Sequence, residues 1–267
     1  MRLRRLAATR FEHVITEGRT HPLVLACRSD RASGPEQRFL VKAIGCPEVR
    51  SSWQLVTETV GNAIARRMGV LTPVPAVVEI SDVMARLVNR SLEGGGHSFK
   101  IEAGLAAGCE FIPGLANFTV GQRLNPEMRN QAVRIFTFDM LSQNPDRRRD
   151  KVNCGLTKSG LIAFDFELCF AHKFLHVIGG DRIEPWEPSA AQISRNHLFY
   201  EEVKATPLAF ETVEMMASDL NVEWWEALSI ALPGPWRMDA ERIGADLRLI
   251  SSHAQDFAKD ISTRCLL

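Results

Sequence analysis

Short runs of apolar and β-branched residues, separated by turn-forming residues, occupy much of the first eighty positions of the chain. They predict strands at residues 11–16, 22–28, 38–44 and 74–80. Between the third and the fourth run the apolar spacing becomes helical, and it predicts a helix over 55–68 that ends at Gly69. The expected order in this part of the chain is therefore strand, strand, strand, helix, strand.

The rest of the chain has mainly helical periodicity. After Pro126 the spacing of apolar residues predicts a helix that reaches Met140, and a polar loop over 142–153 follows it. Two short apolar runs on either side of residues 157–160 predict a β-hairpin. The last eighty residues repeat apolar positions at intervals of three and four, which indicates further helices. The fold class that we expect is α+β.

Glycine is frequent over residues 91–125, and no clear periodicity is present there. We therefore interpret this segment as a connector between two lobes. The first lobe, residues 1–90, would contain an N-terminal antiparallel sheet with one helix. The second lobe, residues 126–267, would be mainly helical and would carry the loop of 142–153.

The composition narrows the classes of function. The chain has 32 lysines and arginines and 32 aspartates and glutamates, so it lacks the broad positive charge that attracts nucleic acids, and a nucleic-acid partner is not expected. The six cysteines are scattered with no C-x-x-C pair, which gives no support for a zinc ribbon or a redox motif. No run approaches the roughly 18 apolar residues that a membrane span needs. With no signal peptide evident, we expect a cytoplasmic protein with reduced thiols.

Two charged residues lie in the strand-rich part at informative positions. Lys42 lies inside an apolar strand, and Glu58 lies on the helix that follows. A lysine in an apolar strand more often faces solvent from a half-exposed sheet. The pattern also places Glu58 opposite the apolar face of its helix, which favours an exposed glutamate. The small neighbour Gly61 would nevertheless let another segment approach on the Glu58 side.

Three more polar residues follow in the helical part. Asp146 and Asn153 lie in the polar loop, and Asp165 comes directly after the hairpin. In a kinase-type phosphoryl transfer a lysine, held by a helix carboxylate, neutralises phosphates, an Asn and an Asp bind Mg²⁺, and a loop Asp orients the attacking hydroxyl. The residues of this chain occur in that order, so together they indicate a phosphotransferase more strongly than each does alone.

Longer stretches around these positions resemble the HipA-like kinases, which are related to the phosphatidylinositol kinase group. The resemblance covers about residues 10 to 260 and is closest to stand-alone members, without the extra N-terminal subdomain of a toxin-type HipA. It rests on two sets of segments. The helical part supplies Asn144-Pro145-Asp146-Arg147, Asn153-Cys154-Gly155-Leu156 and Ile162-Ala163-Phe164-Asp165-Phe166-Glu167, and the strand-rich part supplies Thr20-His21-Pro22-Leu23, Phe39-Leu40-Val41-Lys42, Glu58 with Ala63 to Val70, and Pro73-Val74-Pro75.

The resemblance implies a two-lobed kinase-like fold that uses ATP and Mg²⁺. It implies that Lys42 contacts the phosphates, Glu58 holds Lys42, Asp146 is the catalytic base, and Asn153 and Asp165 bind the metal. The chain departs from typical kinases because seven positions, rather than five, separate Asp146 from Asn153.

In this chain Lys151 occupies the five-residue position. There are two further departures. Glu167 replaces the glycine of an Asp-Phe-Gly motif, and it would be either a third carboxylate near the metal or a surface residue. In place of a G-x-G-x-x-G loop the chain has a one-glycine turn, whose Gly18 and Thr20 are candidates to contact the phosphates.

The leading hypothesis is an ATP-dependent phosphotransferase that acts on a hydroxyl acceptor, and the acceptor that we favour is a serine or threonine of a protein. The alternatives are a nucleotide-binding pseudokinase or interaction protein, and a kinase of a lipid or small molecule. The sequence does not identify the acceptor, which is an unknown protein or small molecule.

Residues outside these motifs give further expectations. Asp139 falls near the middle of the apolar face of its helix, so we expect it to be buried and to accept hydrogen bonds from the loop of 142–153. The run Arg147-Arg148-Arg149 either binds an acidic substrate or is solvated. The histidines 172, 176 and 197 lack a partner at metal-site spacing and are interpreted as structural.

Overall fold

The computed structural model describes residues 3–29, 34–170, 184–186, 191–205 and 210–266. The strand-rich part contains β1 (Arg4–Val14), β2 (Leu23–Ser29), β3 (Gln37–Lys42), α1 (Ser52–Arg67), β4 (Pro75–Ile80), α2 (Asp82–Gly94) and β5 (Gly104–Glu110). The remainder contains β6 (Ala116–Asn117), α3 (Pro126–Leu141), β7 (Cys154–Thr157), β8 (Gly160–Ala163), α5 (Ala191–Asn196), α6 (Tyr200–Lys204), α7 (Phe210–Ser218), α8 (Val222–Ala231), the 3₁₀ helix η3 (Gly234–Trp236), α9 (Arg237–Ser252) and α10 (Ala254–Leu266). The mixed α+β class is confirmed.

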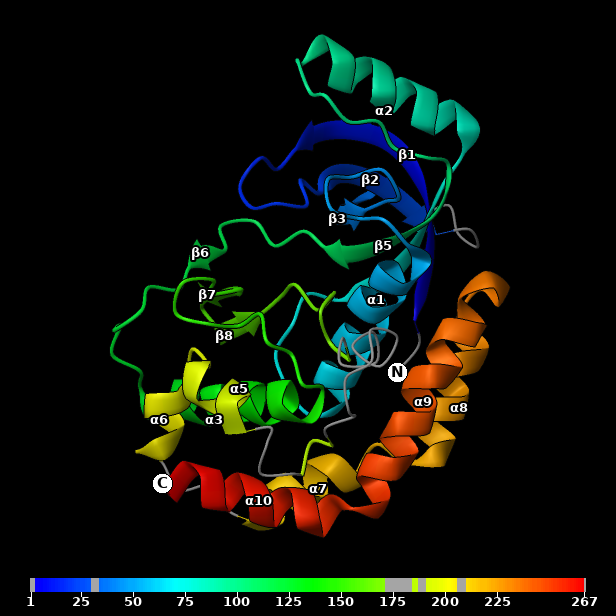
Figure 1. Ribbon diagram of the computed structural model, residues 1–267. Helices are drawn as coiled ribbons and strands as arrows, with labels where there is room; N and C mark the ends of the chain where they lie inside the picture. The colour runs from blue at the N-terminus through cyan, green and yellow to red at the C-terminus, as the bar shows by residue number, and fades with distance from the viewer. Residues whose placement is uncertain (1–2, 30–33, 171–183, 187–190, 206–209, 267) are drawn as a thin grey trace.

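The first five strands close into a barrel in the order β1-β2-β3-β5-β4 (Figure 1). Four of the neighbouring pairs are antiparallel, but β1 and β4 are parallel and close the barrel. The expectation of an antiparallel sheet with one helix is therefore corrected. Two register irregularities in the long strand β1 let it bend and pair with β2 and with β4.

The fifth strand of the barrel, β5, lies inside the segment that the sequence predicts to be a connector. It pairs with β3 and β4, so Ala107 lies beside Lys42 and Val77. Its small residues follow from close packing: a Cβ on Gly108 would come within 2.6 Å of Val78 Cγ2. Barrel strands made of alanine and glycine have little β-propensity, which is why the pattern does not reveal this one.

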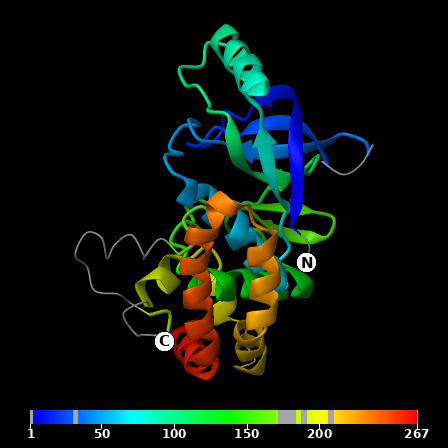
Figure 2. The ribbon, with the colours of Figure 1, turned by 90° about the vertical axis from the view of Figure 1, so that its right-hand side faces the viewer.

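Helix α1 lies between the barrel and the C-terminal helices (Figures 1 and 2). Its residues from Leu55 to Ala65 are all buried, so no face of the helix is free to meet solvent there. The interpretation of Glu58 as exposed fails for this reason, because it assumed one apolar and one solvated face. The burial of α1 on all sides brings Glu58 into the interior of the molecule.

The helical part follows the sequence pattern closely. Asn125 caps α3 by accepting a hydrogen bond from the Met128 amide, with Pro126 in the first turn. Strands β7 and β8 form the expected hairpin and β6 pairs with β7. The periodic run from Ile243 to Ile261 belongs to two helices, α9 and α10, with His253 between them.

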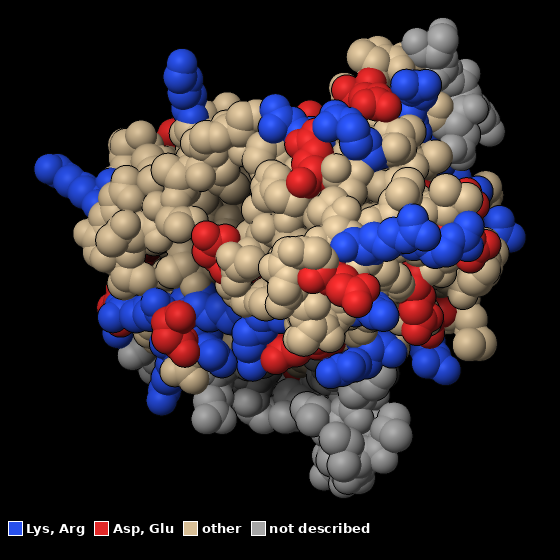
Figure 3. Space-filling view, turned by 90° about the horizontal axis from the view of Figure 1, so that it is seen from above, with Lys and Arg blue, Asp and Glu red and all other residues tan. Residues whose placement is uncertain are grey.

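Surface charge, helix length and the cysteines give three further observations on the described residues. Basic and acidic side chains are interspersed on the face seen from above the barrel (Figure 3). Among the described residues, no helix combines the length and the apolar character that crossing a membrane requires. The thiols of Cys27, Cys46, Cys109, Cys154 and Cys169 are free.

Candidate active site

A cavity of about 670 Å³ runs along one side of the barrel and brings together segments distant in the sequence. Its lining includes the turn between β1 and β2, strands β3 and β5, the segment that follows β5, and residues near both ends of the hairpin β7–β8. All but one of the predicted site residues line it, namely Gly18, Thr20, Lys42, Glu58, Asn153 and Asp165. The remaining one, Asp146, is buried behind Lys151 and Asn153, which it contacts.

At the inner end of this cavity, three carboxylates surround the ammonium group of Lys42. Its Nζ lies 2.9 Å from Glu58 Oε2, 2.5 Å from Asp165 Oδ1 and 3.1 Å from Glu167 Oε2. The predicted ion pair between Lys42 and Glu58 is therefore present. Glu167 is 8% exposed and belongs to the cluster, so the alternative that Glu167 is a surface residue is wrong.

Burial and charge compete in this cluster. Burial alone would lower the pKa of Lys42, but the carboxylates of Asp165, Glu58 and Glu167 outweigh it and raise the pKa well above the ordinary value. Burial would raise the pKa of Asp165, and Lys42 instead holds it below the usual range. Glu167 keeps a raised pKa, since burial and its two acidic neighbours together exceed the attraction of Lys42. Glu167 is thus more readily protonated than Asp165.

Close packing of α1 against the segment after β8 fixes the positions of these groups. A Cβ on Gly61 would lie 3.1 Å from the Cβ of Phe166, so the glycine allows the segment to approach on the Glu58 side, as the sequence suggests. The Phe166 amide donates to Glu58 Oε2 at 2.9 Å, and the Thr57 hydroxyl donates to the Glu167 carbonyl at 2.8 Å. The helix and the acidic segment therefore position each other.

Asp146 has two donors on one carboxylate oxygen. Lys151 Nζ and Asn153 Nδ2 both donate to Oδ2, the latter at 3.0 Å. Lys151 Nζ also lies 3.8 Å from Asp165 Oδ2, so it stands between Asp146 and Asp165. The sequence marks Lys151 only by its position in the loop, and this contact was not predicted.

Asp139 is fully buried and holds the loop after α3, as predicted. Its Oδ1 accepts from Asn144 Nδ2 at 2.9 Å, and its Oδ2 accepts from Arg147 Nε at 2.6 Å. The Asn144 side chain in turn accepts from the Asp146 amide at 3.1 Å. A chain of two hydrogen bonds therefore connects Asp139 to the backbone of Asp146.

Arg147 links the loop to the segment that carries Asp165. Its Nη1 donates to the carbonyl of Asn153 and, at 3.1 Å, to the carbonyl of Phe164. With 1% of its surface exposed, Arg147 is neither solvated nor available to a substrate, unlike Arg148 and Arg149. We call Asp139, Asn144, Arg147 and His197 the buried clamp, since they fix the backbone on either side of Asp146 and before Asp165.

His197 is the member of the buried clamp that the sequence missed. Its Nε2 lies 2.8 Å from Asp139 Oδ2, and its Nδ1 accepts from the Phe199 amide at 3.1 Å. Because Nδ1 accepts, the ring is neutral and Nε2 carries the proton. Burial lowers the pKa of His197 despite the nearby carboxylate, whereas Arg147 and His197 overcome burial to lower the pKa of Asp139. The histidines at 172 and 176 lie outside the described residues.

The one-glycine turn borders the outer part of the cavity. Gly18 has a φ of 88°, which only glycine adopts without strain, and Thr20 lies two residues on. Between them Arg19 pairs with Glu48 at 3.4 Å, and both of these side chains also line the cavity. The turn thus brings polar groups to the cavity without the glycine-rich sequence of typical kinases.

Three carboxylates of the cavity fit a divalent cation. Glu58, Asp165 and Glu167 each offer an oxygen, and these oxygens lie within 4.8 Å of one another. Carboxylate oxygens are the ligands that Mg²⁺ prefers. Asn153 is the other predicted ligand, and its side-chain amide nitrogen faces Asp146. The nitrogen rather than the oxygen faces this residue because a carboxylate can only accept a hydrogen bond.

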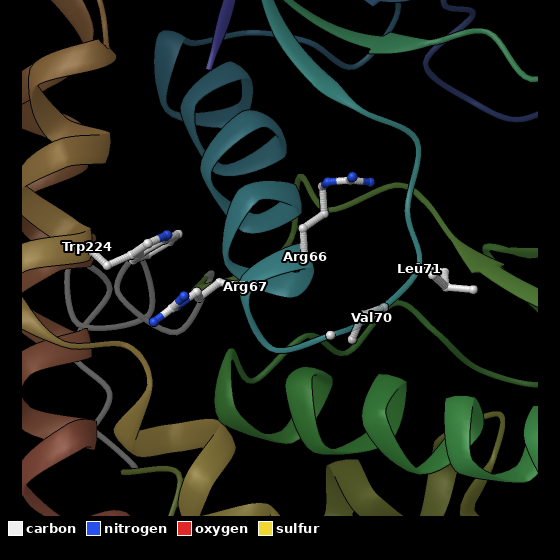
Figure 4. Close-up of a pocket in the computed structure, with 6 residues that line it drawn as sticks. Arg66, Arg67, Val70, Leu71 and Trp224 are labelled. Carbon is white, nitrogen blue, oxygen red and sulfur yellow. The ribbon is translucent and has the colours of Figure 1, made fainter. Parts of the chain in front are cut away.

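A second pocket of about 330 Å³ lies at the C-terminal end of α1 (Figure 4). Its arginines hold the backbone: Arg66 donates to the Thr72 carbonyl at 2.6 Å and Arg67 to the Asp219 carbonyl at 3.1 Å. Gly69, Val70, Leu71 and Trp224 complete the lining, and none of the described residues that line the pocket is a carboxylate or a nucleophile. The cavity around Lys42 is therefore the better candidate for chemistry.

Comparisons with known proteins concern the family and the fold of the chain. The protein-family model described as HipA-like kinase matches residues 10–254. Among solved structures, the chain is similar to the proinflammatory kinase CtkA of Helicobacter pylori, with a TM-score of 0.56 and 10% sequence identity over 96% of each chain. At this identity the likeness concerns the fold alone. No curated protein matches the chain.

Proposed function

The chain belongs to the HipA-like kinase family, and from this premise we propose that it transfers the γ-phosphate of ATP to a hydroxyl group. The acceptor that we favour is the hydroxyl of a protein serine or threonine. The observation that carries the proposal is the meeting of Lys42, Glu58 and Asp165 at the inner end of a cavity, with Asp146 beyond Lys151. A kinase-type phosphotransferase requires these groups in this arrangement.

Nucleotide binding would use both charged and apolar residues of the cavity. We propose that Lys42 contacts the phosphates and that Glu58 keeps it in place, while the turn at Gly18 and Thr20 covers them. Apolar residues that also line the cavity, including Leu40, Leu115 and Phe164, would hold the base. Segments on both sides of the cavity support a further proposal, that the barrel and the helical part act as two lobes, with β5 counted in the first.

For the metal, we propose that Asp165 holds a divalent cation together with Glu167. When bound, Mg²⁺ neutralises the charge that the phosphates carry and develop during transfer. Glu58 remains paired with Lys42 in this arrangement, because its Oε2 also accepts from the Phe166 amide.

In the transfer step Asp146 would accept the proton of the acceptor hydroxyl. The acceptor oxygen then forms a bond to the γ-phosphorus, and the bond from that phosphorus to the bridging oxygen breaks, which releases ADP. Asn144, hydrogen-bonded to the Asp146 amide, would keep this residue in position. Lys151 contacts the carboxylate from the cavity side, so it lies next to the transferred group.

Labelled ATP with Mg²⁺ and a mixture of protein substrates tests the proposal, with modified residues located by mass spectrometry. We expect phosphoserine or phosphothreonine on the protein itself or on a substrate, and loss of it in a Lys42→Ala variant. Lys158, exposed in the hairpin turn, offers the matched control Lys158→Ala. Phosphorylation that survives in the Lys42→Ala variant would remove Lys42 from the proposal.

One observation favours a nucleotide-binding pseudokinase as the second candidate. Asp146 is only 4% exposed, and both Lys151 and Asn153 donate to its carboxylate. Binding of Mg-ATP with no transfer to any acceptor would select this alternative. Transfer to a lipid or metabolite, but not to protein, would select a small-molecule kinase.

A further inference from the structure

We propose that the ammonium group of Lys151 takes the place of a second divalent cation, so that this protein binds its nucleotide with one metal ion. The inference rests on the proposed function and concerns the same cavity. It follows from three observations: the position of Lys151, the orientation of Asn153 and the turn that carries Lys151.

The first observation is where the Lys151 ammonium lies. It contacts Asp146 Oδ2 and is 3.8 Å from Asp165 Oδ2. In protein kinases one Mg²⁺ is held by the Asp of the Asp-Phe-Gly motif and a second one by the Asn of the catalytic loop. The acidic cluster of Glu58, Asp165 and Glu167 offers one such position. The second would have to lie toward Asp146, and the lysine brings a fixed positive charge there.

The second observation is that Asn153 donates to the same carboxylate oxygen as Lys151. Its Nδ2 donates to Asp146 Oδ2 at 3.0 Å and approaches the Asp146 carbonyl at 3.4 Å. Its own carbonyl accepts from Arg147, which fixes the backbone at this residue. Asp146 Oδ2 therefore already accepts from two donors, Lys151 and Asn153, so this oxygen is engaged where a second divalent cation would need an oxygen ligand.

The third observation explains how Lys151 reaches this place. Arg148 and Lys151 exchange backbone hydrogen bonds of 2.9 and 3.2 Å, so Arg149 and Asp150 form a tight turn between them. This turn accommodates the two positions by which the loop exceeds the five-residue spacing. The Arg148 side chain also pairs with Asp150, and its backbone pairs with His197. The longer loop is therefore an ordered structure that directs Lys151 toward Asp146.

Counting bound metal ions tests the inference without relying on activity. Mn²⁺ binding would be followed by electron paramagnetic resonance, with a non-hydrolysable ATP analogue at saturation and nucleotide binding measured in parallel by equilibrium dialysis. We expect one Mn²⁺ per complex in the wild-type protein and in Lys151→Arg, which keeps the charge. In Lys151→Met, which removes the charge at similar length, we expect a second Mn²⁺. The control Lys158→Met should bind one.

Two Mn²⁺ ions per complex in the wild-type protein would overturn the inference while leaving the proposed function intact. The same holds if Lys151→Met binds a single Mn²⁺ with unchanged affinity, because the ammonium would then not occupy the position of a cation. A wild-type protein that binds no nucleotide in the dialysis arm would instead overturn the proposed function, and the inference with it.

Discussion

Replacing Asp139 with asparagine is expected to destabilise the protein strongly, because it breaks the ion pair at the centre of the buried clamp. The side chains of Asp139 and Arg147 are both 0% exposed. The substitution preserves the size of the side chain and removes its charge, so the guanidinium becomes an uncompensated buried cation. Loss of one partner of a buried ion pair costs about 3–5 kcal/mol. Folded proteins are stable by only roughly 5–15 kcal/mol in total.

Urea denaturation followed by circular dichroism measures this loss. We expect the free energy of unfolding to fall by about 3 kcal/mol, at the lower end of that range because asparagine can keep one hydrogen bond. The control Asp150→Asn removes a carboxylate that pairs with Arg148 at the surface, and it should leave the midpoint unchanged.

A second variant separates the charge from the rest of the side chain. In Asp139→Asn/Arg147→Met neither charge remains, so the double variant should be more stable than Asp139→Asn alone. A loss of less than about 1 kcal/mol in the single variant, the usual value for an exposed pair, would refute the reasoning. So would a double variant that is less stable than the single one.

Three further predictions follow from the site. Because the folded protein keeps His197 neutral with a lowered pKa while the unfolded chain takes up a proton near pH 6.5, stability should fall below that pH by up to about 1.4 kcal/mol per pH unit. His197→Gln should lose this slope in urea titrations at several pH values, and the control His13→Gln, at an exposed position on β1, should keep it. The side chain in Gly61→Leu would clash with Phe166, so this variant should lose about 1–3 kcal/mol of its free energy of unfolding and should bind an ATP analogue more weakly, as measured by calorimetry. The control Gly94→Leu on α2, where nothing lies within 4 Å, should show neither effect, and equal effects of the two variants would contradict the close-packing argument. Asp146→Asn should bind Mg-ATP normally and lose phosphate transfer, whereas Asp165→Asn should lose its metal-dependent affinity for ATP. Equal affinities of the two variants for Mg-ATP would contradict this division of roles.

Local pattern predicted those elements whose neighbours in space are also neighbours in sequence. The hairpin of β7 and β8 and the helix from Pro126 have turn and cap residues that act within a few positions. Strand β5 was not predicted because its Gly108 is required by the packing of Val78 on the neighbouring strand β4, which no local pattern reports. Helix α2 had a detectable signal, since the Ser81 side chain caps it by accepting from the Met84 amide.

The site residues were found by chain order and resemblance, and their partners were found where they lie close in sequence. Asp139 is eight positions before Arg147, so burial of one pointed to the loop of the other. His197 lies 58 positions from Asp139, and a lone histidine carries no signal of a partner so distant. Glu58 was misjudged by pattern because burial on every side of α1 is a property of the tertiary structure.

The closed barrel also has a consequence for how the chain meets other chains. Each barrel strand has two hydrogen-bonded neighbours, and among the described strands the barrel offers a free edge only where β1 extends beyond its short pairing with β4, which covers residues 4–7. In the three-stranded sheet the outer strand β6 has only two residues, and β8 donates to Gln131 and to the carbonyl of Leu71. Over the residues that the structure describes, these short or covered edges disfavour strand exchange and edge-to-edge aggregation, and they leave side chains as the main surface for a partner.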